Sequence, residues 1–104
     1  MTTKEYFKLN AQEKERLCQT LDPHNSDEWD IFKSVEKMFL DKFGHQEGIE
    51  KVKCSLAPML GPYNCIMVFI PKGKGRVTVP RMFEGFPIEK IYESKLKHYK
   101  ELVK

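Results

Sequence analysis

The sequence predicts an α+β domain: two N-terminal helices, then a three- or four-stranded antiparallel sheet and a short C-terminal helix, with the helices packed on one face of the sheet. Apolar side chains recur at helical spacing before Gly44, and strand-like patterns follow Gly48. Helices and strands that are segregated along a chain are typical of the α+β class. The links between the strands are short, which favours hairpins over crossovers. No repeat or linker divides the chain, so we expect one domain over residues 1–104.

Capping signals place the two N-terminal helices. Asn10 with Glu13 matches a capping box, and Pro23 ends the helix that follows. The second helix is predicted to start at Asn25 or Ser26 and to end at Gly44. Its apolar residues form a wide arc that must lie on an apolar surface, most simply a sheet; they are Trp29, Ile31, Phe32, Val35, Met38, Phe39, Leu40 and Phe43.

The strands are predicted from a change in the spacing of apolar residues after Gly48. Residues 49–56 alternate loosely, and residues 63–70 are apolar on both faces, as in a central strand. Residues 76–79 are predicted to form a third strand. A turn at Glu84 and Gly85 precedes the last predicted strand. Because proline cannot donate to a ladder, Pro87 indicates either that this strand lies at a sheet edge or that Pro87 is among its first residues. The C-terminal helix is predicted from the spacing of Leu96, Tyr99 and Leu102 or Val103.

The stretch PKGKGR, residues 71–76, raises the question of a phosphate-binding loop. It lacks the spacing of a P-loop and of a dinucleotide fingerprint, and a strand rather than a helix is expected to follow. Two glycines between β-rich runs favour the turn of a hairpin. One possibility is that the tip of this hairpin is a solvated turn with no further function. The alternative is a nucleic-acid contact through Lys72, Lys74, Arg76 and Arg81, with help from Lys51, Lys53 and the C-terminal lysines.

The loop between the first two strands is the second candidate site. Pro58 and Pro62 stiffen it, and a preordered loop lowers the entropy cost of binding. Apolar side chains there would suit a protein partner, and the expected contact residues are Met59, Leu60, Tyr63 and Asn64. The alternative is that Leu60 and Tyr63 cap the open end of the sheet.

Charge is distributed unevenly along the chain. Through Glu47 there are seven Lys or Arg against ten Asp or Glu, and after it eleven against five. Such a split can indicate an acidic partner such as nucleic acid. The alternative is that lysines near the C-terminus complement the dipole of a final helix.

The residue types needed for catalysis or metal binding do not gather in a recognisable pattern. His24, His45 and His98 lack ligand spacing, so we expect no metal and no other cofactor. Cys54 is better placed than Cys65 as a nucleophile, since Cys65 falls in the most apolar strand. The leading hypothesis is therefore a non-enzymatic protein-interaction domain, adaptor or regulatory. Nucleic-acid binding is the second hypothesis, and a small enzyme with a cysteine or carboxylate in a cleft is the third.

The expected location is the cytoplasm. Three widely spaced cysteines form no closed disulfide framework, and the first ten residues contain no apolar segment of a signal peptide. The longest apolar run, residues 65–70, is far shorter than the ~20 residues of a membrane helix. We expect no membrane partner, and an uncovered strand edge offers a route to a homo-oligomer.

Overall fold

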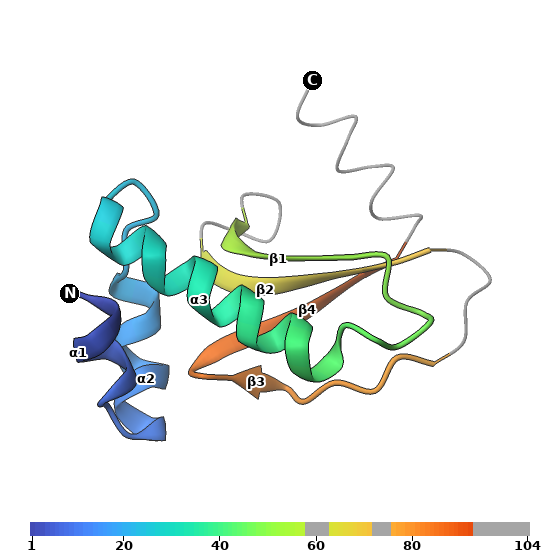
Figure 1. The fold of residues 1–104 in the computed structure, drawn as a ribbon, viewed down its shortest axis with the longest axis horizontal. Coiled ribbons are helices and arrows are strands. Elements are labelled where there is room, and N and C mark those ends of the chain that lie inside the picture. Colours follow the sequence, from blue (N-terminus) through green and yellow to red (C-terminus); the bar gives the residue numbers. More distant parts are fainter. Residues whose placement is uncertain (58–62, 72–75, 93–104) are drawn as a thin grey trace.

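Helices and a single sheet make up the part of the chain that the computed structural model describes, residues 1–57, 63–71 and 76–92 (Figure 1). The elements in order are α1 (Thr3–Phe7), α2 (Ala11–Leu17), a 3₁₀ turn η1 (Cys18–Thr20), α3 (Ser26–Phe43), β1 (Lys51–Ala57), β2 (Tyr63–Ile70), β3 (Met82–Phe83) and β4 (Phe86–Tyr92). α3 lies across the sheet, and α1 and α2 lie beyond one end of it (Figure 1). The α+β class is therefore confirmed. The predicted C-terminal helix lies outside the described residues.

Capping interactions set where the helices begin. The Asn10 side chain accepts the Glu13 amide proton while the Glu13 carboxylate accepts that of Asn10, so the predicted capping box is confirmed. Thr2 and Glu5 form a second such box at the start of α1, a helix that the sequence analysis did not predict. Asn25 caps α3, as expected.

α3 presents a narrower apolar face than its sequence suggests. Ile31, Phe32, Val35 and Phe39 are buried against the sheet and the N-terminal helices. Met38 and Leu40, which we expected in the same arc, are 38% and 40% exposed. The buried face of α3 is narrower than predicted, because the hydrophobicity of a residue does not show how much of the helix surface the sheet covers.

The sheet is mixed rather than antiparallel, which corrects the predicted topology. The strand order is β1-β2-β4-β3, with β1 antiparallel to β2 and β3 antiparallel to β4. The two central strands, β2 and β4, run parallel from the pair Ile66 and Ile88 to the pair Ile70 and Tyr92. The prediction failed because the link between these strands is a crossover, which parallel strands require.

The predicted hairpin at residues 71–76 is also wrong. Residues 76–80 form no strand, and the next strand, β3, pairs with β4 instead of β2. Two contacts hold this segment against the rest of the molecule. Val77 is buried in the core, and the Gln46 side-chain amide donates to the Thr78 carbonyl and accepts from the Thr78 amide. The alternating pattern of Val77 and Val79 therefore reflects local burial, not strand pairing.

A two-residue turn joins β3 to β4, as predicted. Glu84 and Gly85 have φ angles of 51° and 87°, the pair of positive values found in type I′ hairpins. The N-terminal helices hold this turn. The Tyr6 hydroxyl donates to the Glu84 carbonyl at 2.5 Å, and the Cys18 thiol donates to the Gly85 carbonyl at 3.1 Å. Lys14 forms an ion pair with the Glu84 carboxylate.

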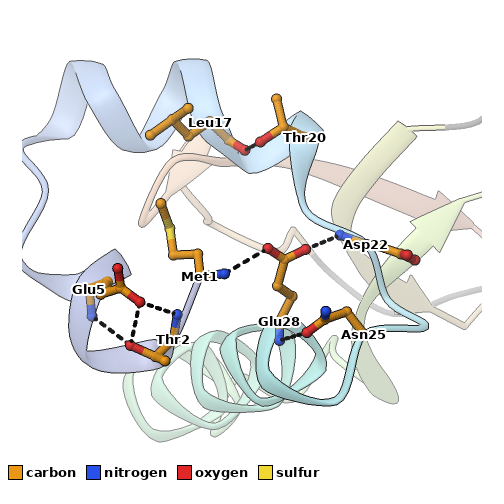
Figure 2. Close-up of polar contacts among 8 residues, drawn as sticks. All are labelled: Met1, Thr2, Glu5, Leu17, Thr20, Asp22, Asn25 and Glu28. Atoms are coloured by element: carbon orange, nitrogen blue, oxygen red, sulfur yellow. Dashed lines mark hydrogen bonds and ion pairs between the residues drawn. The ribbon is translucent and has the colours of Figure 1, made fainter.

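Polar contacts around Glu28 connect the N-terminal helices to α3 (Figure 2). One carboxylate oxygen accepts from the amide of Asp22 at 2.8 Å, and the other pairs with the amino group of Met1 at 3.0 Å. These two contacts, in that order of importance, lower the pKa of Glu28. The carboxylate thus fastens α1 and the α2–α3 link to the first turn of α3.

We predict that Gly85→Ala destabilises the protein. A Cβ at this position would lie 2.6 Å from the backbone of Lys14, at a φ of 87° that disfavours side chains. The expected loss is about 2 kcal/mol or more of unfolding free energy, measured by urea denaturation. Glu84→Gly is the control: relief of the positive φ offsets the lost ion pair, so its stability should stay within about 1 kcal/mol of the wild type. Equal stability of Gly85→Ala and wild type would contradict this account of the turn.

Candidate binding surfaces

The predicted protein-partner residues divide between the surface and the core. Met59 and Leu60 lie outside the described residues. Tyr63, the first residue of β2, is partly buried, and its hydroxyl donates to the Glu89 carboxylate. It packs against an apolar cluster on the sheet that consists of Ala57, Cys65, Met67, Phe69 and Ile91. Burial and the contact with Glu89 raise the pKa of Tyr63, so the phenol stays protonated at neutral pH. Tyr63 therefore lies at the sheet end that adjoins the loop.

Asn64 is internal, with 2% of its surface exposed. Its side-chain amide donates to the carbonyls of Cys18 and Leu21, each at 2.8 Å. Its backbone is held as well, because the Gln19 side chain donates to the Asn64 carbonyl and accepts from its amide. Asn64 thus joins β2 to the 3₁₀ turn, and its side chain is engaged within the chain rather than offered to a partner.

The predicted nucleic-acid residues also divide. Lys72 and Lys74 lie outside the described residues, while Arg76 and Arg81 are both exposed. The Arg81 carbonyl accepts from the Ile88 amide, which places Arg81 beside the first half of β4. Arg76 lies two residues before Thr78, which Gln46 holds near the start of β1. The two arginines are therefore at different places along the sheet and do not form one tip.

Lys51 and Lys90 lie at one end of the sheet, on opposite faces of it. We call this end the basic end: the start of β1 and the finish of β2 and β4, at the right of Figure 1. Lys51 is paired with Phe69 and is exposed there, and Lys90 is exposed two residues before the end of β4. Arg76 is two residues before Thr78, which contacts Gln46 of the α3–β1 link. Glu47 and Glu50 lie in the α3–β1 link at the same end, so the local balance is mixed among the described residues.

The parallel pairing adds basic sequence to this end. β2 finishes at Ile70 and β4 at Tyr92, and these two residues are paired neighbours. The chain leaves both strands at adjacent points. The lysines that follow each exit in sequence are Lys72 and Lys74 after β2, and Lys95, Lys97, Lys100 and Lys104 after β4. The parallel pairing that brings the two exits together was not expected, because the strands were predicted to be antiparallel.

The cysteine thiols are poorly suited to nucleophilic chemistry. Cys18, Cys54 and Cys65 are all buried and free. Burial is the main cause that raises the pKa of each thiol, to about 12 for Cys65. A catalytic thiol needs the opposite shift. Among the described residues, no three His, Cys, Asp or Glu side chains come together as a metal site.

The outer edge of β1 carries a contact that bears on the predicted strand-edge oligomer. The amide of Cys54 donates to the Glu36 carboxylate of α3 at 2.8 Å. A side chain that occupies an edge amide, with its charge at the edge, opposes the pairing of another strand there. Oligomerisation through this edge stays a prediction.

Comparison with models of protein families, with curated proteins and with solved structures found no match to this chain. In the described parts of the chain, no helix is both long enough and apolar enough to cross a membrane.

We predict that replacing Asn64 destabilises the domain. Asn64→Ala leaves two buried carbonyls without their side-chain donor and should cost about 2–3 kcal/mol in urea denaturation at neutral pH. Asn64→Asp should cost more, since it sets a carboxylate against the same carbonyls. Burial would raise the folded-state pKa of that carboxyl above its unfolded value of about 3.9. The deficit relative to Asn64→Ala should therefore grow as pH rises above about 4. A wild-type midpoint for both variants would contradict the structural role of Asn64.

Proposed function

We propose that the protein is a non-enzymatic binding domain whose basic end binds nucleic acid. The observation that carries the proposal is the parallel pairing that brings the exits of β2 and β4 together. Each exit is followed within a few residues by lysines, and Lys51 and Lys90 are exposed on the two faces of the sheet near this end. A residue spans at most about 3.6 Å of chain, so lysines two to five residues beyond each exit stay within about 20 Å of it.

Phosphate groups are natural ligands of lysine and arginine side chains. Lysine and arginine side chains neutralise backbone phosphates and release condensed counterions, which requires no base-specific pocket. The chain after Glu47, which includes all the strands, carries eleven Lys or Arg against five Asp or Glu. Contacts of this kind would give affinity with little sequence preference.

Salt-dependent binding is the predicted result. We would measure fluorescence anisotropy of labelled RNA, single-stranded DNA and duplex DNA with the full chain at low and at near-physiological salt. Replacing Lys72, Lys74 and Arg76 by Ala should weaken binding at low salt and reduce the slope of log K against log salt by about 2–3.

The matched control removes three positive charges from the N-terminal helices instead. Lys4, Lys8 and Arg16 are exposed on the N-terminal helices or their link, and their replacement by Ala removes three positive charges away from the basic end. This control should keep most of the affinity and slope. Equal loss in both triple variants would show that only net charge matters, and absence of binding at low salt would end the proposal.

A protein partner at the loop after β1 is the second candidate. Tyr63 favours it, because this residue is partly exposed where the chain enters β2. That end is about 23 Å from the basic end along β2, at about 3.3 Å per residue. The two surfaces can therefore be tested separately.

For the loop, the predicted outcome is loss of a co-purifying partner on Met59→Asp with Leu60→Asp. The control is Met38→Asp with Leu40→Asp, which alters an exposed Met and Leu of α3 in the same way. We would purify the tagged full chain with each pair of substitutions and compare the bound proteins. Retention of the same partner by the loop variant and the control would remove the loop from consideration.

A further inference from the structure

The amide of Cys54 that points away from β2 is held by a side chain of α3 rather than by a strand. β1 is the outermost strand on this side of the sheet that the described residues form. The Cys54 amide donates to a Glu36 carboxylate oxygen at 2.8 Å. Backbone groups alternate in direction along an antiparallel strand, so the amides of Val52 and Leu56 point the same way as that of Cys54. The Glu36 carboxylate therefore occupies the position that a carbonyl of a neighbouring strand would take.

The flank of α3 that contains Glu36 is partly apolar and partly accessible to solvent. A helix turns by about 100° per residue, so Trp29, Glu36 and Leu40 lie within about 40° of one another around α3. Leu40 is 40% exposed, and Trp29 is partly exposed. Because Glu36 reaches the Cys54 amide, this flank is the one beside β1. We call the backbone of residues 52–56, together with this flank, the β1 edge site.

We propose that the β1 edge site binds an extended peptide of a partner protein, which adds to the sheet as a further strand beside β1. Strand addition draws affinity from main-chain hydrogen bonds and specificity from alternate side chains of the peptide. A peptide carbonyl would take the Cys54 amide and release Glu36. The outward backbone groups of Val52 and Leu56 would pair with the same peptide, two residues to either side.

The charge of Glu36 determines which peptides fit. A carboxylate at a strand edge opposes the pairing of most strands, because its displacement leaves a negative charge beside the new backbone. A Lys or Arg at the peptide residue next to Cys54 would pair with the released carboxylate, so the same side chain rejects most strands and accepts a basic one. Lys33 is exposed on α3 one turn before Glu36, so a uniformly basic peptide is disfavoured.

Leu40 determines a second position of the peptide. α3 and β1 run in opposite directions (Figure 1), so Leu40 lies from Glu36 toward the start of β1 and Trp29 toward its end. Four helical residues separate Glu36 from Leu40 by about 6 Å along α3, close to the roughly 6.6 Å between alternate residues of a strand. An apolar peptide residue two positions from the basic one would therefore contact Leu40. Trp29 offers further apolar surface on the other side of Glu36.

This inference is independent of both candidates proposed above, because Arg76, Lys90 and Tyr63 lie outside the β1 edge site. We would select peptides from a phage-displayed library of random decapeptides on the immobilised full chain. Enriched sequences should carry a Lys or Arg with an apolar residue two positions away. The most enriched peptide would then be synthesised with a fluorescent label, and its affinity would be measured by anisotropy.

Substitutions on opposite sides of α3 test the location. Leu40→Asp should weaken binding of the selected peptide about tenfold or more, because it removes an apolar contact of the site. Met38→Asp is the matched control, since Met38 is 38% exposed and lies about 160° away from Leu40 around the helix. It should bind like the wild type. Hydrogen exchange of the Val52 and Leu56 amides should slow when the peptide is bound to the wild type.

Charge reversal tests the role of Glu36. Glu in place of the basic peptide residue should lower affinity for the wild type about fivefold, and Glu36→Lys should prefer this altered peptide over the original. Failure to enrich any sequence, or equal binding of the selected peptide to Leu40→Asp and wild type, would overturn the proposal. A concentration-dependent dimer of the free chain that Leu40→Asp abolishes would assign the site to a second copy, and would overturn it as well.

Discussion

The parallel pairing of β2 with β4 is the constraint on which the rest of the fold depends. A strand that pairs in parallel with an earlier one must start from the same end of the sheet, so the described part of the connection, residues 76–85, leads back along the sheet. Their return brings Val77 into the core and places β3 at the outer edge beside β4. Pro87, which cannot donate to a ladder, lies just before the parallel pairing begins at Ile88.

The N-terminal helices stabilise the point where this return ends. Tyr6 is fully buried and packs against Phe86 while its hydroxyl bonds the Glu84 carbonyl. A buried phenol is costly without a hydrogen-bond partner, so the turn and the helix each satisfy a polar group of the other. Residues 78 positions apart are joined in this way, and the β3–β4 turn thereby acquires a fixed place relative to α1 and α2.

Sequence reasoning succeeded where local signals decide structure and failed where long-range contacts decide it. The caps at Asn10 and Asn25, the two-sided burial of residues 63–70 and the Glu84–Gly85 turn follow from nearby residue types. The parallel pairing of β2 with β4 does not follow from nearby residue types. No local pattern shows whether the strand that pairs with β2 is connected to it by a hairpin or by a crossover. For the same reason Asn64 looked like a loop contact: its partners, Cys18 and Leu21, are more than 40 positions away in the chain.

The same topology also separates the functions that the surfaces could serve. β2 is apolar on both faces, and its two ends adjoin different features: Tyr63 with the loop at one, the paired exits of β2 and β4 at the other. The start of β2 offers a partly exposed aromatic side chain, whereas Lys51 and Lys90 are exposed near its finish. The eight residues of β2 hold these two ends about 23 Å apart, at about 3.3 Å per residue, so a substitution at one end can be tested without altering the other.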